Sequence, residues 1–260
     1  MLETDKICYV CNENATSREH VPPLCLFPES KDVRGLNFRK DLITVPSCDE
    51  HNSKKSSDDE FLMVSIAGIV GNNSLGYYHT RTKIDRALRR KSKDFLNKAI
   101  IRNSKEGIIK IGKGNKFPVL SGNPDFERLK QCFKNIAYGL YYQEYNFSFK
   151  GEIEMLLGFI RYNDPNDQTL VRFTRKRFEL EELSLEIKGE NPDVFKYQFC
   201  QADKSGLIAL KLIFYEASEV FIAFLPQGQD IPFNLGFELM KSGVPSTFTL
   251  KGEKFEFNKK

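Results

Sequence analysis

A chain of 260 residues is long enough for one large domain or two smaller ones, and its 40% apolar and 28% charged residues are ordinary for a soluble globular protein. It has no run of about 18 apolar residues, so no membrane-spanning helix is expected. The first residues lack the basic and then apolar pattern of a signal peptide, so we expect a cytoplasmic protein.

The formal net charge of +4 is distributed unevenly along the chain. The stretch from His79 to Lys116 contains 13 Lys and Arg residues but three acidic residues, so its net charge is +10. The rest of the chain therefore carries −6. A charge asymmetry this large predicts a polyanionic partner.

The first 60 residues are rich in turn formers, and they predict short elements. Strands are expected at 6–9 and 42–45, and residues 20–23 should be extended because a residue before proline is kept out of the helical region. Cap residues and first-turn acids after Ser56 predict a helix there. Strand, strand and helix is the order of a ββα unit.

Longer elements are expected further along the chain. Apolar residues at helical spacing predict a basic helix at about 78–102, a strong amphipathic helix at 125–145 and another helical turn or two at 152–159. A short hairpin is expected at 108–120. From about Thr169 onward the residue pattern favours β-structure, with strands expected at 194–201, 206–215, 219–225 and in a hairpin of 247–251 with 254–257.

Two pairs of metal-ligand residues carry the clearest chemical signal. Cys8-x-x-Cys11 is followed, after a gap of 36 residues, by Cys48-x-x-His51. Four such ligands suit tetrahedral Zn²⁺. The alternative is a redox Cys-x-x-Cys, which normally opens a helix, but the residues after Cys11 indicate a turn. We therefore expect structural zinc on these four residues. The other three cysteines have no such partner spacing, and each is expected to be a small buried or half-buried side chain: Cys25, Cys132 and Cys200.

Between the two pairs lies Glu19-His20-Val21-Pro22-Pro23, and Asn52 follows the second pair directly. Alone, His20 is more simply read as a residue that ends a strand. Its position beside Glu19 and between the two zinc-ligand pairs favours a functional role.

Residues 8–60 resemble the zinc-bound form of the HNH, or ββα-metal, nuclease superfamily, in particular a bacterial and phage subgroup. The resemblance covers about a quarter of the chain. It implies that His20 is the general base and that Glu19 and Asn52 hold a catalytic divalent cation, Mg²⁺ or Mn²⁺. The chain departs from the usual pattern in three places, with Glu19 for Asp, Asp41 for a structural Asn, and His51 for the fourth Cys.

We expect an α+β protein in three parts. The resemblance implies a zinc-bound HNH module at 1–75, and the residue pattern predicts a basic helical connector at 76–118 and a C-terminal α+β domain with antiparallel strands at 119–260. The expected activity is DNA phosphodiester hydrolysis, with restriction or antiphage defence as the context, and RNA cleavage stays open. A non-catalytic zinc module that binds nucleic acid or protein is the alternative. The C-terminal region could serve as a scaffold, in target recognition or in formation of a homo-oligomer.

Two further features leave alternatives open. The basic residues Arg86, Arg89, Arg90 and Lys93 are expected to contact nucleic acid, the alternative being a basic surface that pairs with the acidic remainder of the chain. Asp59 could assist the catalytic metal site, although a carboxylate that favours the start of a helix is the simpler interpretation.

Overall fold

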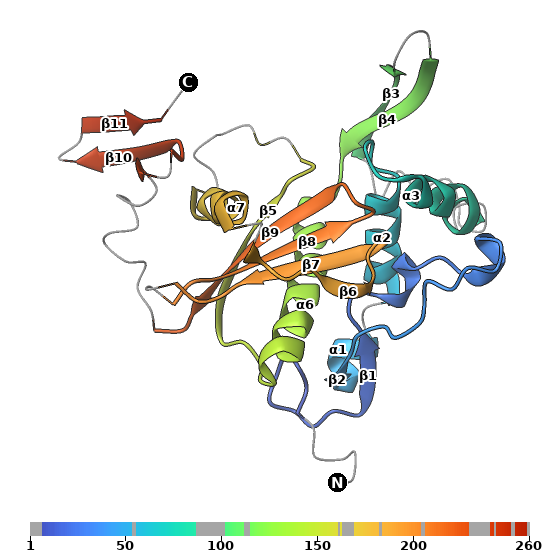
Figure 1. The fold of residues 1–260 in the computed structure, drawn as a ribbon, viewed down its shortest axis with the longest axis horizontal. Coiled ribbons are helices and arrows are strands. Elements are labelled where there is room, and N and C mark those ends of the chain that lie inside the picture. The colour runs from blue at the N-terminus through green and yellow to red at the C-terminus, as the bar shows by residue number, and fades with distance from the viewer. Residues whose placement is uncertain are drawn as a thin grey trace.

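The computed structural model describes residues 7–53, 56–86, 102–111, 115–160, 162, 169–181, 184–203, 206–228, 240–241, 243–250 and 253–258. It shows the expected α+β class with antiparallel sheets (Figure 1). Within these residues, no helix has the length and apolar character needed to cross a membrane.

The N-terminal part is built on a pair of short antiparallel strands. β1 (Ser17–His20) pairs with β2 (Thr44–Ser47), so that Glu19 lies opposite Val45 and His20 opposite Thr44. The helical elements around this pair are η2 (Leu24–Leu26), η3 (Ser30–Asp32), α1 (Asp49–Ser53), α2 (Ser56–Ala67), α3 (Ser74–His79) and the π-helical turn η4 (Thr80–Ile84). The helix expected after Ser56 is confirmed, whereas the strand expected at 42–45 lies two residues later and that at 6–9 is a single bridge at Ile7.

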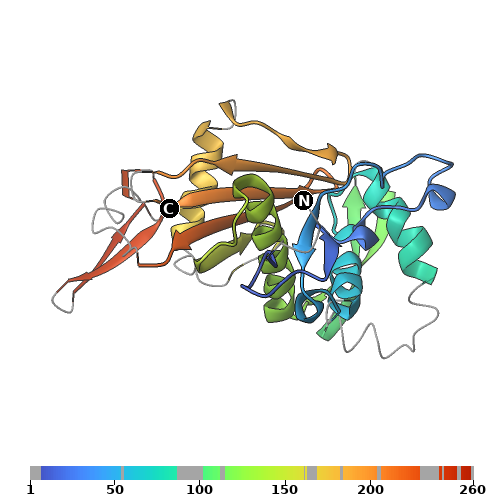
Figure 2. The same ribbon diagram turned by 90° about the horizontal axis from the view of Figure 1, so that it is seen from below.

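A five-stranded antiparallel sheet forms the centre of the molecule, in the order β5-β9-β8-β7-β6. Figure 2 shows α6 and the N-terminal elements on one face of this sheet and α7 on the other. Ring contacts connect the layers, with Phe133 of α6 packed on Phe214 and Phe178 of α7 on Phe221. The elements are β5 (Gly151–Leu157), β6 (Lys188–Asn191), β7 (Phe195–Cys200), β8 (Ile208–Phe214), β9 (Ser218–Pro226), α6 (Phe126–Tyr145) and α7 (Thr169–Glu181).

The buried core is continuous from the N-terminal part to the sheet. A single cluster of buried side chains includes Cys8 and Cys48, several residues of α2 and α6, and Phe224 of β9. A buried hydrogen bond also joins the N-terminal part to the sheet region, because the Tyr215 hydroxyl donates to the Leu26 carbonyl at 2.7 Å. The expected domain boundaries at 75 and 118 stay predictions.

Helix α6 begins and ends as its sequence predicts. The Asp125 side chain accepts a hydrogen bond from the Arg128 backbone N–H at 3.2 Å, and Asn146 ends the helix in the left-handed conformation. Apolar residues at helical spacing bury one face against the sheet. The expected strands of the sheet and the hairpin β10 (Ser246–Leu250) with β11 (Glu253–Phe257) are likewise confirmed.

Three expectations from the sequence are wrong. Residues 152–159 are not helical: Gly151–Leu157 is strand β5, whose exposed Glu152 and Glu154 alternate with more buried residues. Thr169–Glu181 is helix α7, in which Arg177 and Glu181 form an i,i+4 ion pair. The basic helix does not extend to Arg102, because this residue begins strand β3.

β3 (Arg102–Ile111) and β4 (Asn115–Asn123) confirm the hairpin expected at 108–120 and make it longer. Of the basic helix expected at about 78–102, the described helical residues are 78–86, and they belong to a helical stretch that begins at Ser74. The predicted helical residues 87–101 lie outside the described chain.

His79 gives a testable link between packing and pH. Its side chain is completely buried, and Nε2 lies 3.0 Å from the Cys25 carbonyl oxygen. Burial lowers the pKa of His79 from 6.5 to about 4, which outweighs the opposing effect of the Cys25 carbonyl. Because the folded pKa is lower than the unfolded one, the unfolded chain takes up a proton as the pH falls from about 6.5 to 4, and stability is lost in this window.

We expect His79 to cost the wild type up to about 3 kcal/mol of unfolding free energy between pH 7 and pH 4. His79→Gln keeps an amide donor for the Cys25 carbonyl but does not titrate. Urea unfolding of both proteins at several pH values measures the difference, and metal release in acid affects both alike. Parallel pH profiles for the two proteins would contradict this assignment.

Candidate functional site

The two pairs of metal-ligand residues converge on one cluster. Cys8 and Cys11 lie on the loop before β1, Cys48 directly follows β2, and His51 is in α1. One ligand atom from each lies within 4.8 Å of all the others. Cys11 Sγ is 3.8 Å from Cys48 Sγ and 3.6 Å from His51 Nδ1, Cys8 Sγ is 3.7 Å from His51 Nδ1, and Cys48 Sγ is 3.1 Å from the same nitrogen.

These separations fit tetrahedral zinc. Bonds of about 2.3 Å to sulfur and about 2.1 Å to nitrogen at tetrahedral angles separate two sulfurs by about 3.8 Å, and a sulfur from a nitrogen by about 3.6 Å. Three of the four distances agree, and the Cys48–His51 contact is shorter. Burial raises the pKa of the Cys8 thiol, but backbone N–H groups of Val10, Cys11 and Cys48 outweigh this effect and lower it overall. The cluster can therefore hold a metal ion on the four predicted ligands.

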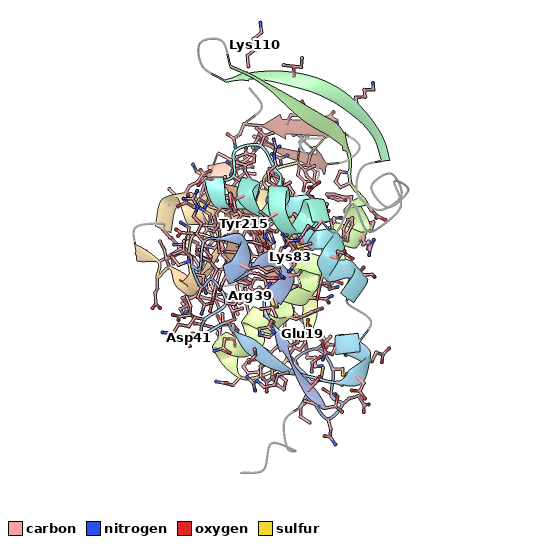
Figure 3. All side chains as sticks on the ribbon, turned by 90° about the vertical axis from the view of Figure 1, so that its right-hand side faces the viewer. Glu19, Arg39, Asp41, Lys83, Lys110 and Tyr215 are labelled. Carbon is pink, nitrogen blue, oxygen red and sulfur yellow. The ribbon has the colours of Figure 1, made fainter. Side chains whose placement is uncertain are left out.

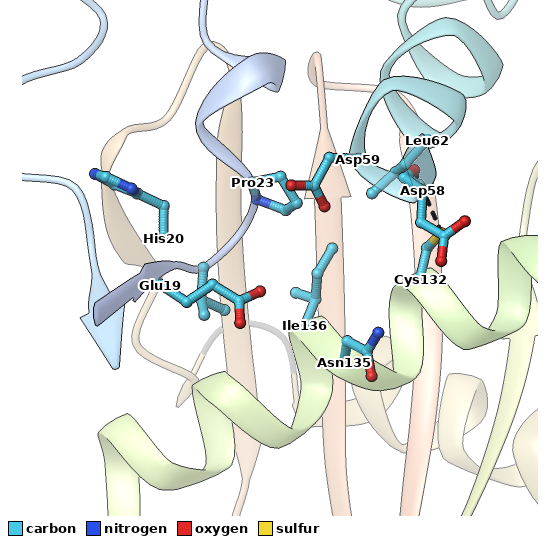
Figure 4. Close-up of a pocket in the computed structure, with 10 residues that line it drawn as sticks. Glu19, His20, Pro23, Asp58, Asp59, Leu62, Cys132, Asn135 and Ile136 are labelled. Carbon is cyan, nitrogen blue, oxygen red and sulfur yellow. Dashed lines mark hydrogen bonds between the residues drawn. The ribbon is translucent and has the colours of Figure 1, made fainter. Parts of the chain in front are cut away.

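Glu19 and His20 end β1 on opposite sides of the strand. The Glu19 side chain is 8% exposed and accepts hydrogen bonds from the Tyr9 hydroxyl at 3.1 Å and from the Ser47 hydroxyl at 3.4 Å. Burial and the Glu19 carboxylate raise the pKa of Tyr9 well above its ordinary value, so Tyr9 remains a donor. The His20 imidazole points away from this carboxylate (Figure 4), as alternation along a strand requires.

The pKa of His20 lies below its ordinary value. Burial is the main cause, the positive charge of Arg39 acts in the same direction, and Glu19 opposes both. His20 is therefore neutral at pH 7, and a neutral imidazole can accept a proton or bind a metal.

A pocket lies beside β1, between this strand, the first turn of α2 and the middle of α6. In Figure 4 the carboxylates of Glu19 and Asp59 point into the same space from opposite sides. Asp58 of α2 also lines the pocket, and it forms an ion pair with Arg128 of α6 at 2.7 Å. The lining residues are Glu19, His20, Val21, Pro23, Asp58, Asp59, Leu62, Cys132, Asn135 and Ile136.

A glycine in α6 allows the segment after His20 to lie against this helix. A Cβ atom at Gly139 would come within 2.5 Å of the Val21 side chain. Cys25 fixes the start of α2 in place, because its thiol donates a hydrogen bond to the backbone carbonyl of Asp59 at 3.1 Å. Contacts between distant parts of the sequence therefore place β1 beside the start of α2.

Asn52 does not join this pocket. Its side-chain amide donates a hydrogen bond to the Ser17 hydroxyl at 2.7 Å, at the other end of β1 from Glu19 and His20. Asp59 does line the pocket, although the sequence favoured a simple helix-start role for it. The sequence signal for Asp59 was its place in the acidic first turn of α2, but only the packing of α2 near β1 brings it opposite Glu19. Asp41 has a φ of 52°, a left-handed conformation that Asp tolerates better than most residues.

The basic residues predicted to contact nucleic acid are described only at Arg86. Its guanidinium holds the Asp32 carboxylate through two hydrogen bonds of 2.8 and 2.6 Å, and this contact lowers the pKa of Asp32. Arg86 therefore fastens the helical segment to η3. Arg89, Arg90 and Lys93 lie outside the described residues.

Comparison of the chain with known protein families, with curated proteins and with solved structures finds no match. The residues of the site therefore carry the functional argument.

Proposed function

We propose that this protein is a metal-dependent endonuclease of the HNH type that hydrolyses phosphodiester bonds in DNA. The observation that carries the proposal is the pocket in which Glu19 faces Asp59. His20 lies beside Glu19 at the end of strand β1, and the four-residue metal cluster lies near the start of the same strand. Carboxylates in a partly enclosed pocket favour a hard divalent cation such as Mg²⁺ or Mn²⁺. Zinc on Cys8, Cys11, Cys48 and His51 would hold β1 and β2 in place.

In this proposal Glu19 is the principal protein ligand of the catalytic cation. Its hydrogen bonds from Tyr9 and Ser47 fix the carboxylate on the pocket side of β1. The resemblance implies Asn52 as the second ligand, whereas the geometry favours Asp59. A bound divalent cation would neutralise charge on the phosphate and stabilise the leaving oxygen.

His20 would accept the proton of the attacking water. Its lowered pKa keeps it neutral, which a base requires at pH 7. Because the imidazole points away from the Glu19 carboxylate, this role requires its half-buried side chain to turn about χ1 toward the mouth of the pocket. Such rotamer changes at a protein surface take picoseconds to nanoseconds.

Nicking of supercoiled plasmid in Mg²⁺ or Mn²⁺ tests the proposal. Loss of a general base costs about 10² to 10⁴ in rate, so we expect His20→Ala to nick at least about a hundredfold more slowly than the wild type. Added imidazole should restore part of the activity of the variant. Equal zinc content and equal thermal unfolding midpoints in both proteins are the control for folding.

Two results would contradict the proposal. If His20→Ala and the wild type nick equally fast, the activity does not belong to this site. If neither protein nicks plasmid in any divalent metal, the alternative function applies, a non-catalytic zinc module that binds nucleic acid or protein. The opposite orientations of His20 and Glu19, and the contact of Asn52 with Ser17, are the observations that favour this alternative.

A further inference from the structure

β3 and β4 form a long two-stranded ribbon that extends away from the body of the molecule (Figures 1 and 3). Lys105, Ile108 and Lys110 are exposed on it, Ile108 by 68%. Figure 3 shows Lys110 near the tip, far from the labelled residues of the body. The second ribbon, β10 with β11, lies at the opposite end of the molecule in Figure 1.

The charge of the β3–β4 ribbon is strongly one-sided. Its two strands, residues 102–111 and 115–123, contain four basic residues and one acidic residue. In the strand register, Lys110 is paired with Lys116. Like charges at directly paired positions destabilise a two-stranded ribbon. The positive excess of these strands and the exposure of Lys105 and Lys110 indicate a surface suited to a polyanion.

The dimensions of the ribbon agree with one kind of polyanion. The major groove of B-DNA is about 12 Å wide and admits a two-stranded β-ribbon. At about 3.3 Å per residue, strands of nine and ten residues span roughly 30 Å, close to one turn of the duplex.

We propose that the β3–β4 ribbon docks on duplex DNA and that its lysines contact the phosphates along a groove. The choice of DNA as the polyanion rests on the proposed nuclease function, and the ribbon would hold the duplex while the pocket acts on it. Of the basic residues expected to contact nucleic acid, Arg86 is held by Asp32, and the other three lie outside the described residues. Lys105 and Lys110, by contrast, are exposed on the ribbon.

The test measures binding without cleavage, by fluorescence anisotropy of a labelled 30-base-pair duplex with no added Mg²⁺ or Mn²⁺. The full-length wild type is compared with Lys110→Thr/Lys116→Thr, which removes the paired charges and keeps residues that favour strands. We expect the ribbon variant to bind at least about fivefold more weakly than the wild type at about 100 mM salt. The slope of its logarithmic affinity against logarithmic salt concentration should fall by an amount equal to about two phosphate contacts. The thermal unfolding midpoint should be unchanged or higher, because the repulsion is gone.

Lys150→Thr/Lys254→Thr is the matched control, since both lysines are exposed away from the β3–β4 ribbon and the loss of charge is the same. We expect its affinity to change less than about twofold. The inference is overturned if the two variants lose affinity equally, or if the ribbon variant binds like the wild type. It is also overturned if duplex RNA binds more tightly than DNA, or if the ribbon variant changes only the oligomeric mass.

The binding test and the nicking test can fail separately. A protein that never nicks plasmid but loses DNA affinity in the ribbon variant retains the inference and loses the nuclease proposal. A protein that nicks through His20 but binds duplex equally well without Lys110 and Lys116 retains the nuclease proposal and loses the inference about the ribbon.

Discussion

Replacing Cys8 by alanine is expected to abolish zinc binding and to lower the thermal unfolding midpoint by at least about 15 °C. Structural zinc contributes an apparent 10 to 16 kcal/mol in small modules, which is comparable to the whole stability of a typical domain, about 5 to 15 kcal/mol. The change removes one of four ligands and leaves the other three to bind zinc much more weakly.

The local structure explains why the loss should be large. β1 and β2 have four residues each, and two such strands alone are at best marginally stable. Cys8 and Cys48 also belong to the continuous core, so the metal cluster supports packing beneath α2 and α6. Loss of the metal should therefore disturb the walls of the pocket as well as the cluster.

Cys200→Ala is the matched control. Cys8 and Cys200 are both completely buried, but Cys200 lies on the opposite face of the sheet, packed with Phe178 and Phe221. The control should keep about one zinc per chain and lose only the roughly 1 kcal/mol expected for a small truncation in the core. Metal content by mass spectrometry and unfolding by circular dichroism measure both effects. A folded wild type without zinc, or equal losses in the two variants, would show that the cluster is not a zinc site.

The sequence predicted those parts of the molecule that depend on local spacing. A two-residue spacing places the two ligands of each pair together by itself, so the spacing alone identifies Cys8, Cys11, Cys48 and His51. The apolar periodicity of Phe126–Tyr145 and the strand patterns near β7, β8 and β9 are also local properties.

The errors occur where distant contacts decide the structure. Gly151–Leu157 contains Glu, Met and Leu, which favour helices, and it becomes a strand because it pairs with β9 along its whole length. The pairing of Arg86 with Asp32, 54 residues earlier, cannot be read from a run of basic residues. Asp59 reaches the pocket only because α2 packs beside η2 and α6, which no spacing near Glu19 reveals.

Replacing Glu19 by glutamine is expected to lower the rate of DNA nicking by at least about a thousandfold. A catalytic metal supplies several kcal/mol of transition-state stabilisation, and each 1.4 kcal/mol lost costs about tenfold in rate. Glutamine has the same shape as glutamate, and its carbonyl oxygen can still accept the hydrogen bonds from Tyr9 and Ser47. The variant should therefore fold and keep zinc, and its defect should arise from the lost charge.

A second pair of variants decides which residue completes the site with Glu19. Asp59→Asn and Asn52→Ala are compared for the Mn²⁺ concentration that gives half-maximal nicking. If Asp59 is the ligand, as its position opposite Glu19 favours, its variant should require at least about tenfold more Mn²⁺. Asn52→Ala should then change this requirement little, because the Asn52 amide is bonded to Ser17. The reverse ranking would restore the ligand set that the resemblance implies.

Glu60→Gln provides the matched control for this comparison. Glu60 follows Asp59 in α2 and undergoes the same change in charge, but it does not line the pocket. Its Mn²⁺ requirement should stay within about threefold of the wild type, because a carboxylate outside the pocket acts on the cation only through screened electrostatics. If Glu60→Gln and Asp59→Asn shift the requirement equally, general charge near α2 controls metal binding and Asp59 is not a ligand. A selective effect of Asp59→Asn would instead show that the cation lies between β1 and α2.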